Sequence, residues 1–117
     1  FPGTGFSEER GKNNTNLNVQ MPPGVPAELW HSALDNLIMP ELNRFKPDFL
    51  LLSAGFDAHH LDPLGRQRLV AGDFARMTRR VKKLAEGRIV SLLEGGYHLE
   101  ALGESCVAHF NALQEDV

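Results

Sequence analysis

The sequence SAGFDAHHLDPLG, from Ser53 to Gly65, follows a short apolar run, and LLEGGYHL, from Leu92 to Leu99, closes a second apolar run further along the chain. The first run, Asp48 to Ser53, predicts a β-strand that is covered on both faces. The second run predicts a strand from Ile89 to Leu93. Each strand then leads into a polar, glycine-containing loop. Loops beyond the carboxyl ends of parallel strands are where ligands collect in open α/β sheets, so these two loops are the first candidates for a functional site.

Helices are expected after each strand. A helix from Ala71 to Glu86 would have an acidic residue near its start, basic residues near its end and Gly87 to stop it. A closing helix is expected from Leu99 to about Leu113, with apolar residues along one stripe. The order strand, helix, strand, helix implies a right-handed crossover between parallel strands. The sequence therefore predicts an α/β fold.

The N-terminal part of the chain has a different character. Residues 1–25 are rich in glycine, proline and asparagine and show almost no apolar periodicity, so they predict irregular structure. Pro26 can occupy the first position of a helix whose apolar residues follow at helical spacing. Pro40 is expected to kink or split that helix before Phe45. Residues 26–117 thus predict the order helix, strand, helix, strand, helix.

Composition limits the possible functions. The chain has 117 residues, of which 42% are hydrophobic and 23% charged, which suits one globular unit. Its net charge of −3 leaves no basic stripe, so a direct nucleic-acid partner is not expected. No apolar run is long enough to span a bilayer, so no membrane association is expected. The single cysteine, Cys106, cannot form an internal disulfide, which suits a reducing compartment such as the cytoplasm.

Asp62 and Tyr97 are the residues in the two loops whose side chains are best suited to metal binding or catalysis. If the strands are neighbours, both side chains emerge at the same edge of the sheet. An aspartate can supply one of the three protein ligands of a catalytic zinc, and a phenol on a tight glycine turn can stabilise the oxyanion formed during amide hydrolysis. The structural alternatives are that Asp62 merely opens a turn before a proline and that Tyr97 is a half-buried tyrosine at a strand end.

Five short motifs follow one another in this chain: PGTG (Pro2 to Gly5), NVQMPPG (Asn18 to Gly24), SAGFDAH, DPLG and LEGGY. In this order they resemble the last part of the catalytic domain of the zinc-dependent histone deacetylase family, which includes acetylpolyamine amidohydrolases. The resemblance implies that residues 1–117 are the C-terminal portion of a single deacetylase domain. That domain would be a three-layer α/β/α structure with a parallel sheet, of the arginase/deacetylase type, and would be incomplete in this chain.

The resemblance also implies roles for individual residues. Asp62 matches the family's last ligand to Zn²⁺. Tyr97 matches the tyrosine that assists the zinc in polarising the acetyl carbonyl, and relatives with histidine there are poor catalysts on acetyl-lysine. Phe1 and Leu69 match positions that line the narrow acyl-lysine channel, and Gly95 and Gly96 form the turn beside it.

Several functional groups that the family uses are not found in this sequence. The family's Asp-x-His ligand pair and its catalytic histidine pair lie upstream of PGTG, so the chain alone is expected to be inactive and to need the N-terminal part of its domain. The complete domain would hydrolyse the acetamide of acetyl-lysine or acetylpolyamine. The alternatives are a non-catalytic scaffold or partner-binding module and a phosphate- or nucleotide-binding domain, although no GxGxxG motif follows a strand. The style of the motifs favours a bacterial cytoplasmic enzyme, or a nuclear and cytoplasmic one if the source is eukaryotic.

Other polar residues are predicted to be structural. Asp57 is expected to cap a turn, and Glu94 to bond to backbone. Adjacent side chains in an extended segment point apart, so His59 and His60 are not expected to bind a metal together. Three histidines are predicted to be ordinary surface or core residues: His31, His98 and His109. Cys106 is predicted to lie in the core, and the charges from Arg79 to Lys83 are predicted to form a solvated helix end.

Overall fold

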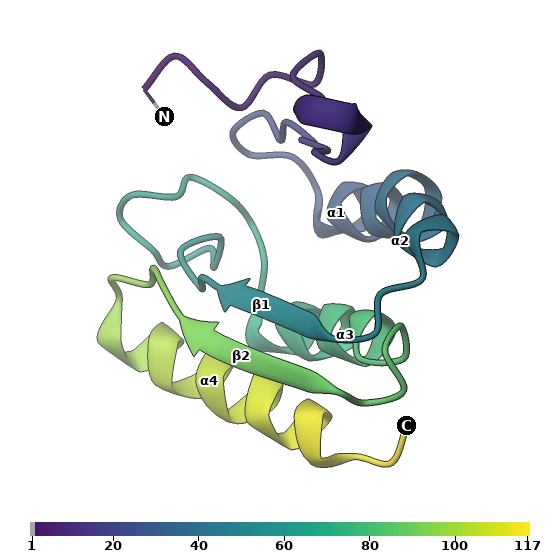
Figure 1. The fold of residues 1–117 in the computed structure, drawn as a ribbon. Helices are drawn as coiled ribbons and strands as arrows, with labels where there is room; N and C mark the ends of the chain where they lie inside the picture. Colours follow the sequence, from purple (N-terminus) through teal and green to yellow (C-terminus); the bar gives the residue numbers. More distant parts are fainter. Residues whose placement is uncertain (1) are drawn as a thin grey trace.

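A computed structural model of the chain describes residues 2–117. Its centre is a two-stranded parallel sheet of β1 (Leu50–Ala54) and β2 (Ile89–Leu93), in which Leu50 pairs with Ile89 and Ala54 with Leu93. Helix α3 (Ala71–Val81) connects the strands, and α4 (Leu99–Gln114) follows β2 (Figure 1). The parallel α/β arrangement predicted from the sequence is therefore confirmed.

Helices α3 and α4 pack against one another and cover one face of the sheet. Leu52 and Ala54 of β1 point toward this helical layer and join Phe56 and Phe74 in the core. The rings of Phe56 and Phe74 meet edge to face, with centroids 5.1 Å apart. The opposite face of the sheet exposes a row of apolar side chains, for which the relative exposure is 69% at Leu51, 44% at Val90 and 54% at Leu92. Among the described residues, helices thus cover one face of the sheet and leave the other exposed.

The N-terminal helix is divided in the way that its proline predicts. It consists of α1 (Ala27–Ala33), a π-helical segment η2 (Leu34–Ile38) and α2 (Met39–Phe45). The N–H of Met39 donates to the carbonyl of Leu34, which is the wider π-type spacing, and Pro40 follows with no N–H of its own. Two ion pairs join this helix to α3: Arg76 with Glu28, and Arg80 with Asp35.

The segment before Pro26 is irregular, as predicted, apart from a short 3₁₀ turn, η1 (Lys12–Asn14). Its last residues attach to the loop that follows β1. The N–H of Gly24 donates to the carbonyl of Arg66 at 2.9 Å, and the Gln67 side-chain amide donates to the carbonyls of Met21 and Pro22, both at 3.3 Å. This segment therefore supports the loop that carries the candidate site.

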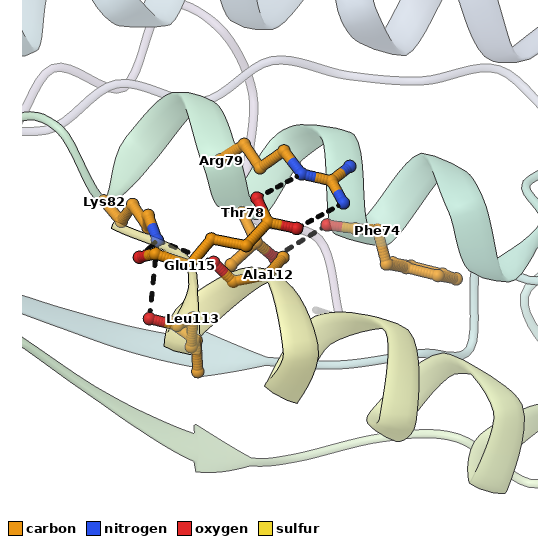
Figure 2. Close-up of polar contacts among 7 residues, drawn as sticks. All are labelled: Phe74, Thr78, Arg79, Lys82, Ala112, Leu113 and Glu115. Atoms are coloured by element: carbon orange, nitrogen blue, oxygen red, sulfur yellow. Dashed lines mark hydrogen bonds and ion pairs between the residues drawn. The ribbon is translucent and has the colours of Figure 1, made fainter. Parts of the chain in front are cut away.

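Helix α3 ends at Val81, five residues before the end that the sequence predicted. Residues 82–87 form turns instead, and Glu86 and Gly87 adopt positive φ angles of 55° and 80°. The predicted solvated helix end is also wrong for Lys82, which is 3% exposed. Its Nζ donates to the carbonyls of Ala112, Leu113 and Glu115 at the end of α4 (Figure 2).

Arg79 completes this junction. Its Nε and Nη2 each lie 2.7 Å from a carboxylate oxygen of Glu115, which forms a two-pronged ion pair (Figure 2).

Long apolar helices of the kind that cross a bilayer are not found among residues 2–117.

Candidate functional site

The loops that leave β1 and β2 lie side by side at the carboxyl edge of the sheet. The Glu94 N–H donates to the carbonyl of Ala54 at 2.9 Å, and the Phe56 N–H donates to the carbonyl of Gly95 at 2.8 Å. Further out, the backbone N–H of Tyr97 donates to Oδ2 of Asp62 at 2.8 Å. The two residues selected from the sequence are therefore in contact, because the backbone of Tyr97 bonds to the side chain of Asp62.

Asp62 is nearly buried, with 8% exposure, and its carboxylate accepts only backbone donors. Oδ1 receives the N–H groups of Leu64 at 2.8 Å and Gly65 at 3.1 Å, which is the Asx turn expected of an aspartate before a proline. Burial alone would raise the pKa of Asp62. The N–H groups of Tyr97, Leu64 and Gly65, with a smaller contribution from His98, outweigh burial and hold that pKa below its ordinary value. The group is therefore an anion at neutral pH.

Two glycines in these loops stand where a larger residue would collide with neighbouring atoms. A Cβ on Gly65 would lie 1.7 Å from the carbonyl oxygen of Asp57, so no other residue fits that position without a change of the loop. Gly96 has a φ of 135°, and a Cβ there would lie 2.7 Å from Cδ1 of Leu102 on α4. The GGY turn is thus set by backbone conformation and by its contact with α4.

The side chain of Tyr97 is 56% exposed, and its hydroxyl makes no hydrogen bond to any other residue in the described range 2–117. This differs from a structural tyrosine, which packs its ring and satisfies its hydroxyl at the end of a strand. The contact with the Asp62 carboxylate is made by the Tyr97 backbone, and the phenol itself is exposed.

The other residues that the sequence assigned to a substrate channel lie as follows. Leu69 has 0% exposure and packs in the core of this chain, and its amide donates to the carbonyl of Ala58. Phe1 lies outside the described residues. Gly95 is half-buried, and its ideal Cβ position lies 3.0 Å from Oδ2 of Asp57.

The adjacent histidines do not point apart. The rings of His59 and His60 stack with centroids 4.6 Å apart, because the segment turns at this point and is not extended. His59 is 2% exposed, and its Nδ1 accepts the N–H of Leu61 at 3.1 Å. Burial, followed by the charge of His60, lowers the pKa of His59, so it is neutral at physiological pH.

The described residues do not form a complete metal site by themselves. Across residues 2–117 there is no group of three His, Cys, Asp or Glu side chains that could hold one. Asp62 is nevertheless suited to be a single ligand, because it is anionic, fixed in position and located at the functional edge of the sheet. A metal at this edge would need its remaining ligands from residues beyond this chain.

Sequence reasoning missed two polar networks. His31, which is 3% exposed, places Nε2 2.7 Å from Oδ1 of Asp73 at the start of α3. His109 lies between Thr78 and Ser91, with its Nδ1 2.6 Å from Oγ1 of Thr78 and its Nε2 2.8 Å from Oγ of Ser91. The apolar stripe of α4 could indicate that His109 faces inward, but not which partners it meets.

Asp57 also differs from the sequence prediction. Its carboxylate makes no hydrogen bond within the described part of the chain and packs against Gly55 and Gly95, so it caps no turn there.

Comparisons with known proteins agree on one family. A family model described as the histone deacetylase domain matches residues 1–113. The chain is 41% identical to histone deacetylase 10, chloroplastic, of Oryza sativa subsp. japonica, over 96% of this chain and 27% of that protein. It is 42% identical to a probable deacetylase of Archaeoglobus fulgidus, over 86% of this chain and 30% of that protein. The crystal structure of the HDA15 HD domain superposes with a TM-score of 0.91 at 34% identity, over 99% of this chain and 34% of that one.

Proposed function

Because the chain belongs to the histone deacetylase family, we propose that it contributes the last part of a zinc-dependent amidohydrolase domain. The complete domain hydrolyses the acetamide of an acetylated lysine or an acetylpolyamine to the free amine and acetate. The chain spans 27% to 34% of the length of the relatives compared above, so this activity belongs to the longer domain and the isolated chain is inactive. The single observation that carries the proposal is the junction of Asp62 with Tyr97.

The two residues have separate roles in this proposal. Asp62 is one ligand of Zn²⁺, and two further ligands come from the part of the domain outside this chain. When bound, the zinc supplies Lewis-acid polarisation of the carbonyl and an acidified water. The Tyr97 hydroxyl donates a hydrogen bond to the acetyl carbonyl oxygen as it becomes negative, which is when such a donor contributes most. We further propose the cytoplasm as the compartment.

The first test replaces Tyr97 by phenylalanine in the full-length protein that contains residues 1–117. The ring is kept and the donor is lost, so deacetylation of an acetyl-lysine peptide should fall by about 10²–10³-fold in kcat with zinc content unchanged. Turnover close to that of the parent would rule out the role of Tyr97.

The second test replaces Asp62 by alanine, with the exposed Asp116→Ala as the control for loss of one carboxylate. Asp62→Ala should lose both zinc and activity, and Asp116→Ala should keep both. A parent protein that is folded, free of zinc and inactive would instead support the scaffold alternative.

A further inference from the structure

The position of Tyr97 is not fixed by its own side chain. The ring is 56% exposed, and the hydroxyl has no partner among residues 2–117. Its neighbour Gly96 has a φ of 135°, a conformation that glycine adopts easily. The hydrogen bonds that hold this turn are therefore those of the backbone.

The backbone around Tyr97 is attached at three points. Before it, the carbonyl of Gly95 accepts the Phe56 N–H at 2.8 Å. After it, His98 is the N-cap of α4 and its Nδ1 accepts the Ala101 N–H at 3.2 Å. Between these points, the N–H of Tyr97 itself donates to Oδ2 of Asp62 at 2.8 Å.

We propose that the Asp62 carboxylate positions Tyr97 through this backbone hydrogen bond, independently of any metal ion. The importance of that position for catalysis rests on the proposed function, whereas the positioning itself does not. A charged acceptor makes a stronger hydrogen bond than a neutral one, and this one is formed at a nearly buried site where water does not compete well. Asp62 is therefore a positioning residue for Tyr97 as well as a candidate ligand.

The arrangement of donors adds a second consequence. Each carboxylate oxygen offers about two lone pairs. Oδ1 of Asp62 already accepts two N–H groups, from Leu64 and Gly65, whereas Oδ2 accepts one, from Tyr97. The free acceptor position is thus on Oδ2, the same oxygen that holds Tyr97. A cation bound there would share an oxygen with the anchor of Tyr97, so occupancy of the site and the position of the phenol are coupled.

The test follows the Tyr97 amide by NMR in the full-length protein after removal of metal with a chelator. The protein carries ¹⁵N-tyrosine and ¹⁵N-leucine, and the loss of one tyrosine signal in Tyr97→Phe assigns the Tyr97 amide. Hydrogen exchange of this amide should be about 10- to 100-fold faster in Asp62→Ala than in the parent, as expected for the loss of a charge-assisted hydrogen bond. The leucines of β1, Leu50 to Leu52, should keep their exchange rates and show that the sheet is intact.

Two further variants keep the test decisive. Asp57→Ala removes a carboxylate from the same loop that contacts Gly95 without a hydrogen bond, so Tyr97 exchange should stay as in the parent. Asp62→Asn keeps one oxygen for the N–H groups of Leu64 and Gly65 and places its NH₂ group opposite the Tyr97 N–H. Because NH₂ is itself a donor, the Tyr97 N–H then loses its acceptor. This variant should accelerate Tyr97 exchange even if Asp62→Ala does not fold.

Equal Tyr97 exchange in the metal-free parent and in Asp62→Asn, with the β1 leucines protected in both, would overturn the inference. Zinc content and activity test the proposed function, whereas Tyr97 exchange tests the positioning role, so the two can fail independently. A protein without zinc or activity that still shows accelerated Tyr97 exchange in the variants would support the positioning role and refute the enzyme. An active zinc enzyme with unchanged exchange would do the reverse.

Discussion

At the scale of single residues, the buried polar groups have defined roles. The Thr78 hydroxyl donates to the carbonyl of Phe74 at 2.7 Å, so its oxygen must accept from Nδ1–H of His109. Nε2 of the neutral His109 ring then accepts the hydroxyl of Ser91. One neutral tautomer of His109 thus joins β2, α3 and α4. Burial lowers the pKa of His109, in agreement with this neutral state.

The lowered pKa of His109 predicts a pH dependence of stability. An unfolded histidine takes up a proton near its ordinary pKa of about 6.5, whereas the folded His109 resists protonation to a lower pH. The free energy of unfolding should therefore be highest above about pH 6.5. It should fall as the pH drops from there through the lower pKa of the folded state. Thermal melts of the full-length protein across this range should show the decrease, and His109→Asn should make it smaller. An identical pH profile for the two proteins would contradict the prediction.

The sequence could select Asp62 and Tyr97 as candidates because their signals are local: each residue lies in a short motif after a strand. The partners of Lys82 and His109 could not be identified in the same way. Periodicity shows which side of a helix faces inward, but the carbonyls that Lys82 meets belong to the end of another helix. Stacking of His59 on His60 could not be predicted from adjacency alone, because the segment turns there instead of running extended.

At the scale of elements, α3 and α4 are joined at their C-terminal ends. The last carbonyls of a helix have no partner within the helix and carry a partial negative charge. The Nζ group of Lys82 has three donors and meets carbonyls of Ala112, Leu113 and Glu115 (Figure 2). Lys82 follows the last residue of α3 directly. The strands and helix starts were predictable from pattern, whereas the partners of Lys82 belong to another helix and were not.

Replacing Lys82 by methionine tests this junction. Methionine fills a similar space but leaves the buried carbonyl of Ala112 and the part-buried carbonyls of Leu113 and Glu115 without this donor, so the free energy of unfolding should fall by ~1–3 kcal/mol. The adjacent Lys83 is exposed, and Lys83→Met should change stability by less than about 0.5 kcal/mol. Denaturant unfolding of both variants in the full-length protein measures the difference. Equal stability of the two variants would show that Lys82 does not support α4.

At the scale of the whole molecule, the sheet is covered by helices on one face only. Leu51, Val90 and Leu92 are exposed in a row on the other face, and both strands are edge strands within the described chain. Soluble proteins avoid such unpaired edges and apolar faces, because they promote association. This agrees with a chain that spans about a third of the HDA15 HD domain.

The isolated 117-residue chain should therefore unfold over a broad temperature range, with weak cooperativity, and should bind a dye that detects exposed apolar surface. The double variant Leu51→Glu with Leu92→Glu should bind less dye as an isolated chain. In the full-length protein, the same double variant should be destabilised, because there the face is proposed to be covered. A sharp and fully reversible transition of the isolated parent chain would show that this portion folds as an independent unit.

The three donors to Asp62 belong to the main chain, and every amino acid except proline offers the same N–H. The anchoring of this carboxylate is therefore largely insensitive to which side chains evolution places at positions 64 and 97. A histidine at position 97 would keep the anchor while changing the chemical group that it presents. Under the role proposed for Tyr97, catalytic strength can thus be lost by a single codon change without loss of the architecture, which allows active and inactive descendants to arise from one ancestral fold.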